Sequence, residues 1–146
     1  MTGINYSRVA LGGLVGGIVA NAGDFVINGV IMADHMRQMA QRLNLNWSVV
    51  SSPSVAMTWM VVDFIYATLI VWTYAAVRPR LGPGPKTAVT AGLVIFAAVT
   101  AILFGFQQMG FFTPDAFAKS TALSAVNAIL TSLAGAWMYR EPPQAP

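Results

Sequence analysis

Four long apolar stretches determine what this chain can fold into. They lie at about residues 7–33, 54–77, 86–109 and 114–139. Each holds about the 20 apolar residues that a helix needs to cross a bilayer. Because hydrocarbon offers no hydrogen-bond partners, the backbone within such a stretch must bond to itself as a helix. The sequence therefore predicts an all-α fold, a four-helix transmembrane bundle in a single domain (1–140), with a flexible Pro-rich tail (141–146).

The composition argues against a soluble domain. Of the 146 residues, 56% are hydrophobic and 9% are charged, whereas soluble domains carry about 25% charged residues. The net charge of +3 comes from basic residues at the ends of the apolar stretches. That placement is typical of headgroup anchoring, so we expect a lipid bilayer as partner and no nucleic acid. Cysteine is absent, which excludes thiolate metal sites and cysteine nucleophiles.

The connection between the first and second stretches has a helical pattern of its own. Met36, Met39, Leu43 and Trp47 recur at helical spacing, with arginine and glutamine residues between them. An apolar face opposed to a basic face is typical of a helix that lies flat at the membrane surface. We therefore expect a short amphipathic interfacial helix at this point.

The first stretch is rich in glycine. Gly12 with Gly16, and Gly13 with Gly17, form two overlapping G-x-x-x-G motifs, which let membrane helices approach closely. The motifs fit either helix packing within the chain or dimerisation of two chains.

Residues 1–22 also have features of a signal peptide. Arg8 is followed by an apolar run and by small residues up to Ala22, as at a cleavage site. However, the apolar run resumes after Asp24 and continues to Met32. We therefore favour a retained transmembrane helix over cleavage.

Two aspartates interrupt the apolar stretches. Asp24 and Asp63 each lie about nine residues, or about 13 Å, from the same predicted membrane surface. No basic residue lies in the apolar interior of a stretch to pair with them, and a charged aspartate at the bilayer centre costs at least about 2.5–3.5 kcal/mol. Protonation, a cation, water or hydrogen bonds must offset that cost. The candidates for this polar layer are Asp24, Asp63, Asn21, Asn28, Tyr66, Thr100, Ser124 and Asn127.

The polar layer has two interpretations. Amide and hydroxyl groups such as those of Asn127 and Ser124 are explained by hydrogen bonds between helices, worth about 0.6 kcal/mol each on average. The two aspartates have two possible roles. They form a site for an ion, a proton or a polar ligand, or they form a protonated pair with a structural role. We predict no metal site and no cofactor, because His35 is the only histidine and the eight methionines are interpreted as lipid-facing or packing residues.

Three segments together resemble a group of small, uncharacterised four-span membrane proteins of bacteria. These segments are the glycine-rich first stretch with its Asn21, Asp24 and Asn28, the hairpin RPRLGPGPKTA (78–88), and the last apolar residues LAGAWMY (133–139). The resemblance implies a four-helix protein of the bacterial inner membrane and carries no activity with it.

The basic residues predict an orientation. One side of a four-span arrangement receives Arg8, Arg78, Arg80, Lys86 and Arg140, and the other receives Arg37, Arg42 and Lys119. Because cytoplasmic loops carry the excess of Lys and Arg, both termini are predicted to be cytoplasmic.

The function expected from these features is not enzymatic, because no nucleophile motif, nucleotide loop or metal-ligand motif is present. We expect an accessory, assembly or self-associating subunit of a membrane complex, which docks through small-residue faces. The alternative is a small oligomeric transporter or channel that uses Asp24 and Asp63 to carry protons or cations.

Overall fold

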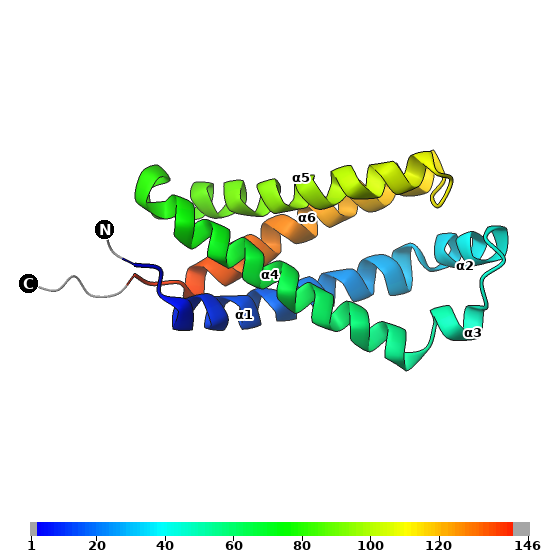
Figure 1. Ribbon diagram of the computed structural model, residues 1–146, viewed down its shortest axis with the longest axis horizontal. Helices are drawn as coiled ribbons and strands as arrows, with labels where there is room; N and C mark the ends of the chain where they lie inside the picture. The colour runs from blue at the N-terminus through cyan, green and yellow to red at the C-terminus, as the bar shows by residue number, and fades with distance from the viewer. Residues whose placement is uncertain (1–2, 142–146) are drawn as a thin grey trace, which may run out of the picture.

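The computed structural model describes residues 3–141, so all of the predicted tail after Glu141 lies outside the described residues. Every regular element in the described range is helical, and four helices are long and apolar enough to cross a membrane (Figure 1). They are α1 (Tyr6–Asp24) continued by η1 (Phe25–Ile31), α4 (Pro53–Leu81), α5 (Pro85–Gln108) and α6 (Pro114–Met138). The prediction of an all-α four-helix bundle is confirmed, and the chain is a small multi-pass membrane protein by the length and composition of these helices.

Local sequence determines where the long helices begin. The hydroxyls of Ser52 and Thr113 accept hydrogen bonds from the backbone amides of the first turns of α4 and α6. In both helices a proline follows at the first position, where its missing N–H costs nothing. Between α4 and α5 the chain reverses at Gly82 (φ 81°), a backbone conformation that favours glycine.

Two short helices fill the first connection: α2 (Ala33–Arg42) and α3 (Trp47–Val50). The Arg37 guanidinium lies 5.8 Å from the Trp47 ring centroid, within cation–π range. Arg42 donates a hydrogen bond of 3.2 Å to the carbonyl oxygen of Phe111, in the turn between α5 and α6. The connection is therefore tied to the end of the bundle that lies opposite the termini, which we call the α2 end.

Glycine lets α1 pack between α4 and α6. Gly12 and Gly16 face α6, and a Cβ atom on Gly12 would lie 2.6 Å from the carbonyl oxygen of Gly135. Gly13 and Gly17 face α4, where a Cβ atom would overlap Thr68 or Phe64. Both G-x-x-x-G motifs are therefore occupied by contacts within the chain.

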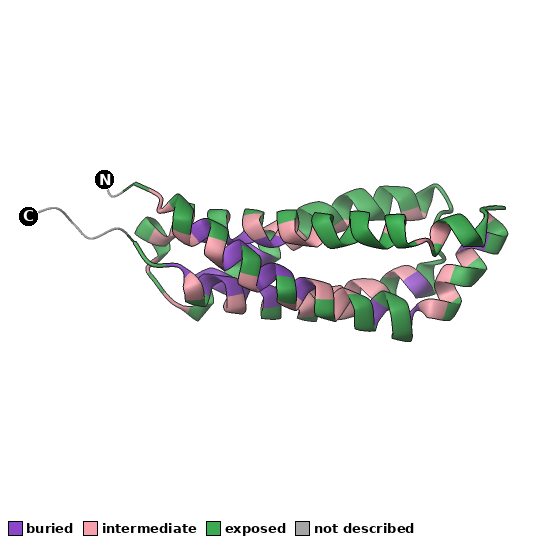
Figure 2. Cartoon of the chain, turned by 90° about the horizontal axis from the view of Figure 1, so that it is seen from below, coloured by how far each residue is buried: buried purple, intermediate pink, exposed green. Residues whose placement is uncertain are grey.

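The buried core is concentrated in the half of the bundle near the termini, which we call the terminal half (Figure 2). Its largest fully buried side chains are Ile70, Val71, Thr131 and Ser132. Toward the α2 end, α4 and α5 expose large apolar side chains, including Trp59 at 60% and Ile102 at 64%. The helices thus pack closely over one half of their length and expose apolar surface over the other.

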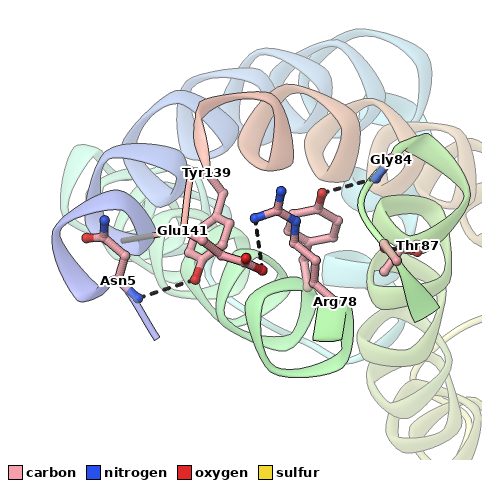
Figure 3. Close-up of polar contacts among 8 residues, drawn as sticks. Asn5, Arg78, Gly84, Thr87, Tyr139 and Glu141 are labelled. Carbon is pink, nitrogen blue, oxygen red and sulfur yellow. Dashed lines mark hydrogen bonds and ion pairs between the residues drawn. The ribbon is translucent and has the colours of Figure 1, made fainter. Parts of the chain in front are cut away.

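An aromatic and ionic cluster joins the two ends of the chain (Figure 3). The Arg78 guanidinium lies 3.1 Å from a carboxylate oxygen of Glu141 and 5.7 Å from the Tyr139 ring centroid. The Tyr139 hydroxyl accepts a hydrogen bond of 3.3 Å from the backbone amide of Asn5. The start of α1, the end of α4 and the segment after α6 are held together at one point.

The same cluster extends to the loop between α4 and α5. The Tyr74 ring packs edge-on against Tyr139 at 5.9 Å, and its hydroxyl accepts a hydrogen bond of 3.3 Å from the amide of Gly84. Thr87 donates a hydrogen bond of 2.8 Å to the carbonyl oxygen of Gly82. Side chains therefore fix the loop that closes the terminal half.

Candidate functional site: a polar layer within the membrane helices

Asp24 lies where α1 passes into the π-helical segment η1. Its carboxylate accepts hydrogen bonds from the Asn28 amide at 3.3 Å and from the Asn127 amide at 3.5 Å. The Asn127 amide also donates to the carbonyl oxygen of Ala20 at 3.0 Å. Asp24 is thus held between η1 and α6 by two neutral donors, and π-helical turns occur frequently at functional sites.

Gly23 makes this contact possible, although sequence reasoning did not single it out. A Cβ atom at Gly23 would overlap the side-chain amide of Asn127. The residue before Asp24 must therefore be glycine for α6 to bring its amide to the carboxylate. A lone glycine beside an intramembrane aspartate was the only signal in the sequence.

Asn21 connects α1 to α4. Its amide donates to the carbonyl oxygen of Gly17 at 2.8 Å, within the helix, and to the carbonyl oxygen of Met60 at 3.3 Å, across the interface. In the second bond, the Asn21 amide is an additional donor to a carbonyl oxygen of α4 that already accepts a backbone hydrogen bond within its helix. Asn21 therefore serves as a link between helices, as the hydrogen-bonding interpretation of the amides expects.

Asp63 and Tyr66 lie on α4 at the seam with α1. The Asp63 carboxyl is within electrostatic range of Asp24, and the Tyr66 hydroxyl is within range of both aspartates. The Asp63 side chain has no hydrogen bond to any residue between 3 and 141, and it is only partly buried. Beside it, Met60 and Val62 are 50% and 41% exposed. Of the two aspartates, Asp63 is therefore the one whose carboxyl has no hydrogen bond within residues 3–141.

The remaining candidates are less closely joined to Asp24. Ser124 and Thr100 are partly buried, and neither side chain bonds to the aspartates within the described part of the chain. α5, which carries Thr100, packs on α4 and α6. Asn28, by contrast, lies in η1 and is exposed, and its amide still bonds to Asp24.

The layer brings together two carboxyls, one phenol and three amides, but no basic group. Across residues 3–141, no cluster of three or more His, Cys, Asp or Glu side chains is positioned to hold a metal ion. Such a set of groups can accept a proton or a monovalent cation, or it can bond to polar groups of a neighbouring helix.

Comparison of the chain with known protein families, with curated proteins and with solved structures found no match. The resemblance to small bacterial membrane proteins therefore stays a prediction.

Proposed function

We propose that the protein is a non-enzymatic subunit that associates, with itself or with another membrane protein, through the exposed seam between α1 and α4. The observation that carries this proposal is Asp63. It lies inside a membrane helix, it is partly buried, and it has no hydrogen-bond partner in residues 3–141. Ionisable residues in membrane helices almost always face protein or water.

Burial against a second protein offers such an environment. A charged aspartate facing lipid at mid-membrane costs at least about 2.5–3.5 kcal/mol, and a polar partner across the seam lowers that cost. The large apolar side chains beside Asp63 are exposed and available for packing. The glycine motifs of α1 are already used within the chain, so association through this seam does not require them.

The test measures the oligomeric state in lipid nanodiscs by single-molecule photobleaching. Asp63→Leu removes the polar contact and should convert the assembled protein to monomer, while Asp63→Asn retains hydrogen bonds and should remain assembled. Asp34→Leu is the control, because it removes a carboxylate from an exposed position in α2, outside the four long helices. A monomeric parent that co-purifies with no other protein contradicts the proposal.

A second function is favoured by a separate observation, the placement of Asp24 and Asp63 on α1 and α4, two helices that pack against each other. Two carboxyls at one depth can pass a proton or a monovalent cation across the bilayer if water reaches them. In proteoliposomes, Asp24→Asn with Asp63→Asn should abolish flux and leave assembly intact. Equal flux in the parent and the double variant contradicts transport.

We also propose that the protein resides in a bacterial inner membrane with both termini in the cytoplasm. Support comes from the basic residues of the terminal half, which are Arg8, Arg78, Arg80, Lys86 and Arg140. The absence of cysteine allows a direct test. In intact cells, a membrane-impermeant maleimide should label Ser48→Cys, and it should label Pro83→Cys only after lysis.

A further inference from the structure

A pocket at the α2 end adjoins the polar layer, with which it shares Asn28. α2 and its cap residue contribute three methionines and the one histidine of the chain to it: Met32, His35, Met36 and Met39. The start of α6 contributes Thr113, Ala116 and Ser120 to the opposite wall. Four soft or borderline donor side chains therefore meet in one cavity.

Helical spacing explains why these four residues meet. Positions 32, 35, 36 and 39 follow an i, i+3, i+4, i+7 pattern and fall within an arc of about 100°. Met32 is 3% exposed and packs with Ile27 and Ala116, while Met36 and Met39 are partly buried. The face is held in place because Arg42 bonds to the turn before α6.

The environment of His35 matches that of a metal-binding histidine. Its Nε2 atom lies 3.7 Å from a carboxylate oxygen of Asp115. Its Nδ1 atom is buried and has no hydrogen-bond partner among residues 3–141. Metal-ligating histidines commonly direct one ring nitrogen to a carboxylate, which orients the ring and leaves the other nitrogen for the metal.

We propose that this pocket binds a single soft monovalent metal ion, Cu(I), through the thioethers of Met32, Met36 and Met39 and Nδ1 of His35. Thioether sulfur selects Cu(I), whereas Mg²⁺, Ca²⁺ and Mn²⁺ prefer oxygen ligands. Asp115 serves as the carboxylate that positions His35. This assignment revises the expectation that the methionines serve only in packing or lipid contact and that the chain holds no metal.

The charges around the pocket fit a monovalent ion. All four proposed ligands are neutral, so the bound ion keeps its single positive charge. Arg42 adds a second positive charge at the pocket, and the carboxylate of Asp115 offsets it. A divalent ion would leave a larger uncompensated charge beside Arg42.

The test uses the purified full chain in nanodiscs and Cu(I) alone, kept reduced without oxygen and titrated against a chromophoric Cu(I) chelator. The parent should bind one Cu(I) per chain. Asp115→Asn should weaken binding by about 10–100-fold, the usual effect of losing the carboxylate that orients a histidine ligand. Met36→Leu with Met39→Leu should weaken it further while preserving side-chain volume.

The matched control replaces three methionines outside the pocket by leucine: Met57, Met60 and Met109, which are 65%, 50% and 73% exposed. It should bind Cu(I) as the parent does. X-ray absorption of the parent complex should show sulfur and nitrogen scatterers, and this measurement does not depend on the folding of any variant. Equal affinity in the pocket and control variants, or a spectrum without sulfur ligands, overturns the proposal.

Discussion

The terminal half and the α2 half of this bundle use the same helices in opposite ways. In the terminal half, α1 meets α4 and α6 through glycines so closely that backbone atoms are in contact. Exposed positions predominate in the α2 half (Figure 2). There α4 and α5 expose large apolar side chains, and the polar layer and the methionine pocket lie in that half or at its border. Lipid tails are as apolar as leucine, so tight association within a membrane requires small residues rather than large ones.

The packed terminal half stabilises the bundle, and the candidate functional groups lie toward the other half of the same helices. In the terminal half, the cluster of Arg78, Tyr74 and Tyr139 fixes the chain ends. The α2 half holds the unsatisfied carboxyl of Asp63 and the buried free nitrogen of His35. The terminal half also has a buried polar atom without a hydrogen-bond partner in residues 3–141, the Thr131 hydroxyl oxygen. Thr131 is sealed in the packed core, whereas Asp63 is partly exposed and a second protein can reach it.

The largest expected effect comes from adding one methyl group to the packed half. At Gly12 a Cβ atom would lie 2.6 Å from the Gly135 carbonyl oxygen and 2.9 Å from a methyl carbon of Val71. Because one of these is a backbone atom that cannot rotate away, Gly12→Ala should lower the free energy of unfolding by about 1–3 kcal/mol. Unfolding in mixed detergent micelles, followed by circular dichroism, measures it.

Gly105→Ala is the matched control in the open half, where a Cβ atom meets nothing within 4 Å. Alanine is a better helix former, so this change should be neutral or stabilise by up to about 1 kcal/mol. Equal destabilisation by the two substitutions would show that the halves do not differ in packing.

The next effect concerns the border between the halves. Asn127→Ala removes the amide that bonds to both Asp24 and the Ala20 carbonyl. Interhelical hydrogen bonds in membranes average about 0.6 kcal/mol and reach about 1.7 kcal/mol. We expect a loss within that range by the same unfolding assay.

Ser124→Ala, one turn earlier on α6, is the control for Asn127→Ala. Ser124 has no side-chain bond to Asp24 within residues 3–141, so its replacement should change the free energy of unfolding by less. If the two variants lose the same stability, the hydrogen bonds of Asn127 do not hold the polar layer together.

Much of this architecture follows from sequence, because helix length and helix start have local causes. Apolar stretches of membrane-crossing length predicted the long helices, among them the stretch 114–139 that forms α6. The rise per residue placed Asp24 and Asp63 at one depth in the membrane. In the structure, the Asn127 amide of α6 contacts Asp24 at this depth. These inferences needed only the rise and the spacing of an α-helix.

The other features of the site depend on contacts between helices, which the spacing of residues along one helix does not reveal. The apolar stretch 7–33 predicted one continuous helix, and its change to π-helical geometry at η1 left no signal in the spacing. Gly23 matters only because Asn127 approaches from α6. Met32, His35 and their neighbours look like one face of an amphipathic helix until α6 supplies the opposite wall of the pocket.

The smallest effect is expected at the cluster that closes the terminal half. Arg78→Ala removes a cation–π contact and an ion pair that is partly screened by water, which contribute about 0.5–1 kcal/mol and about 0–1 kcal/mol respectively. Arg80→Ala removes the same charge from an exposed position two residues away and should have less effect. Salt screens the ion pair but leaves the contact between the guanidinium and the Tyr139 ring in place. Added salt should therefore reduce the difference in free energy of unfolding between Arg78→Ala and Arg80→Ala without abolishing it. A difference that disappears in high salt would assign the stabilisation to the ion pair alone and would exclude a contribution from the contact between Arg78 and the Tyr139 ring.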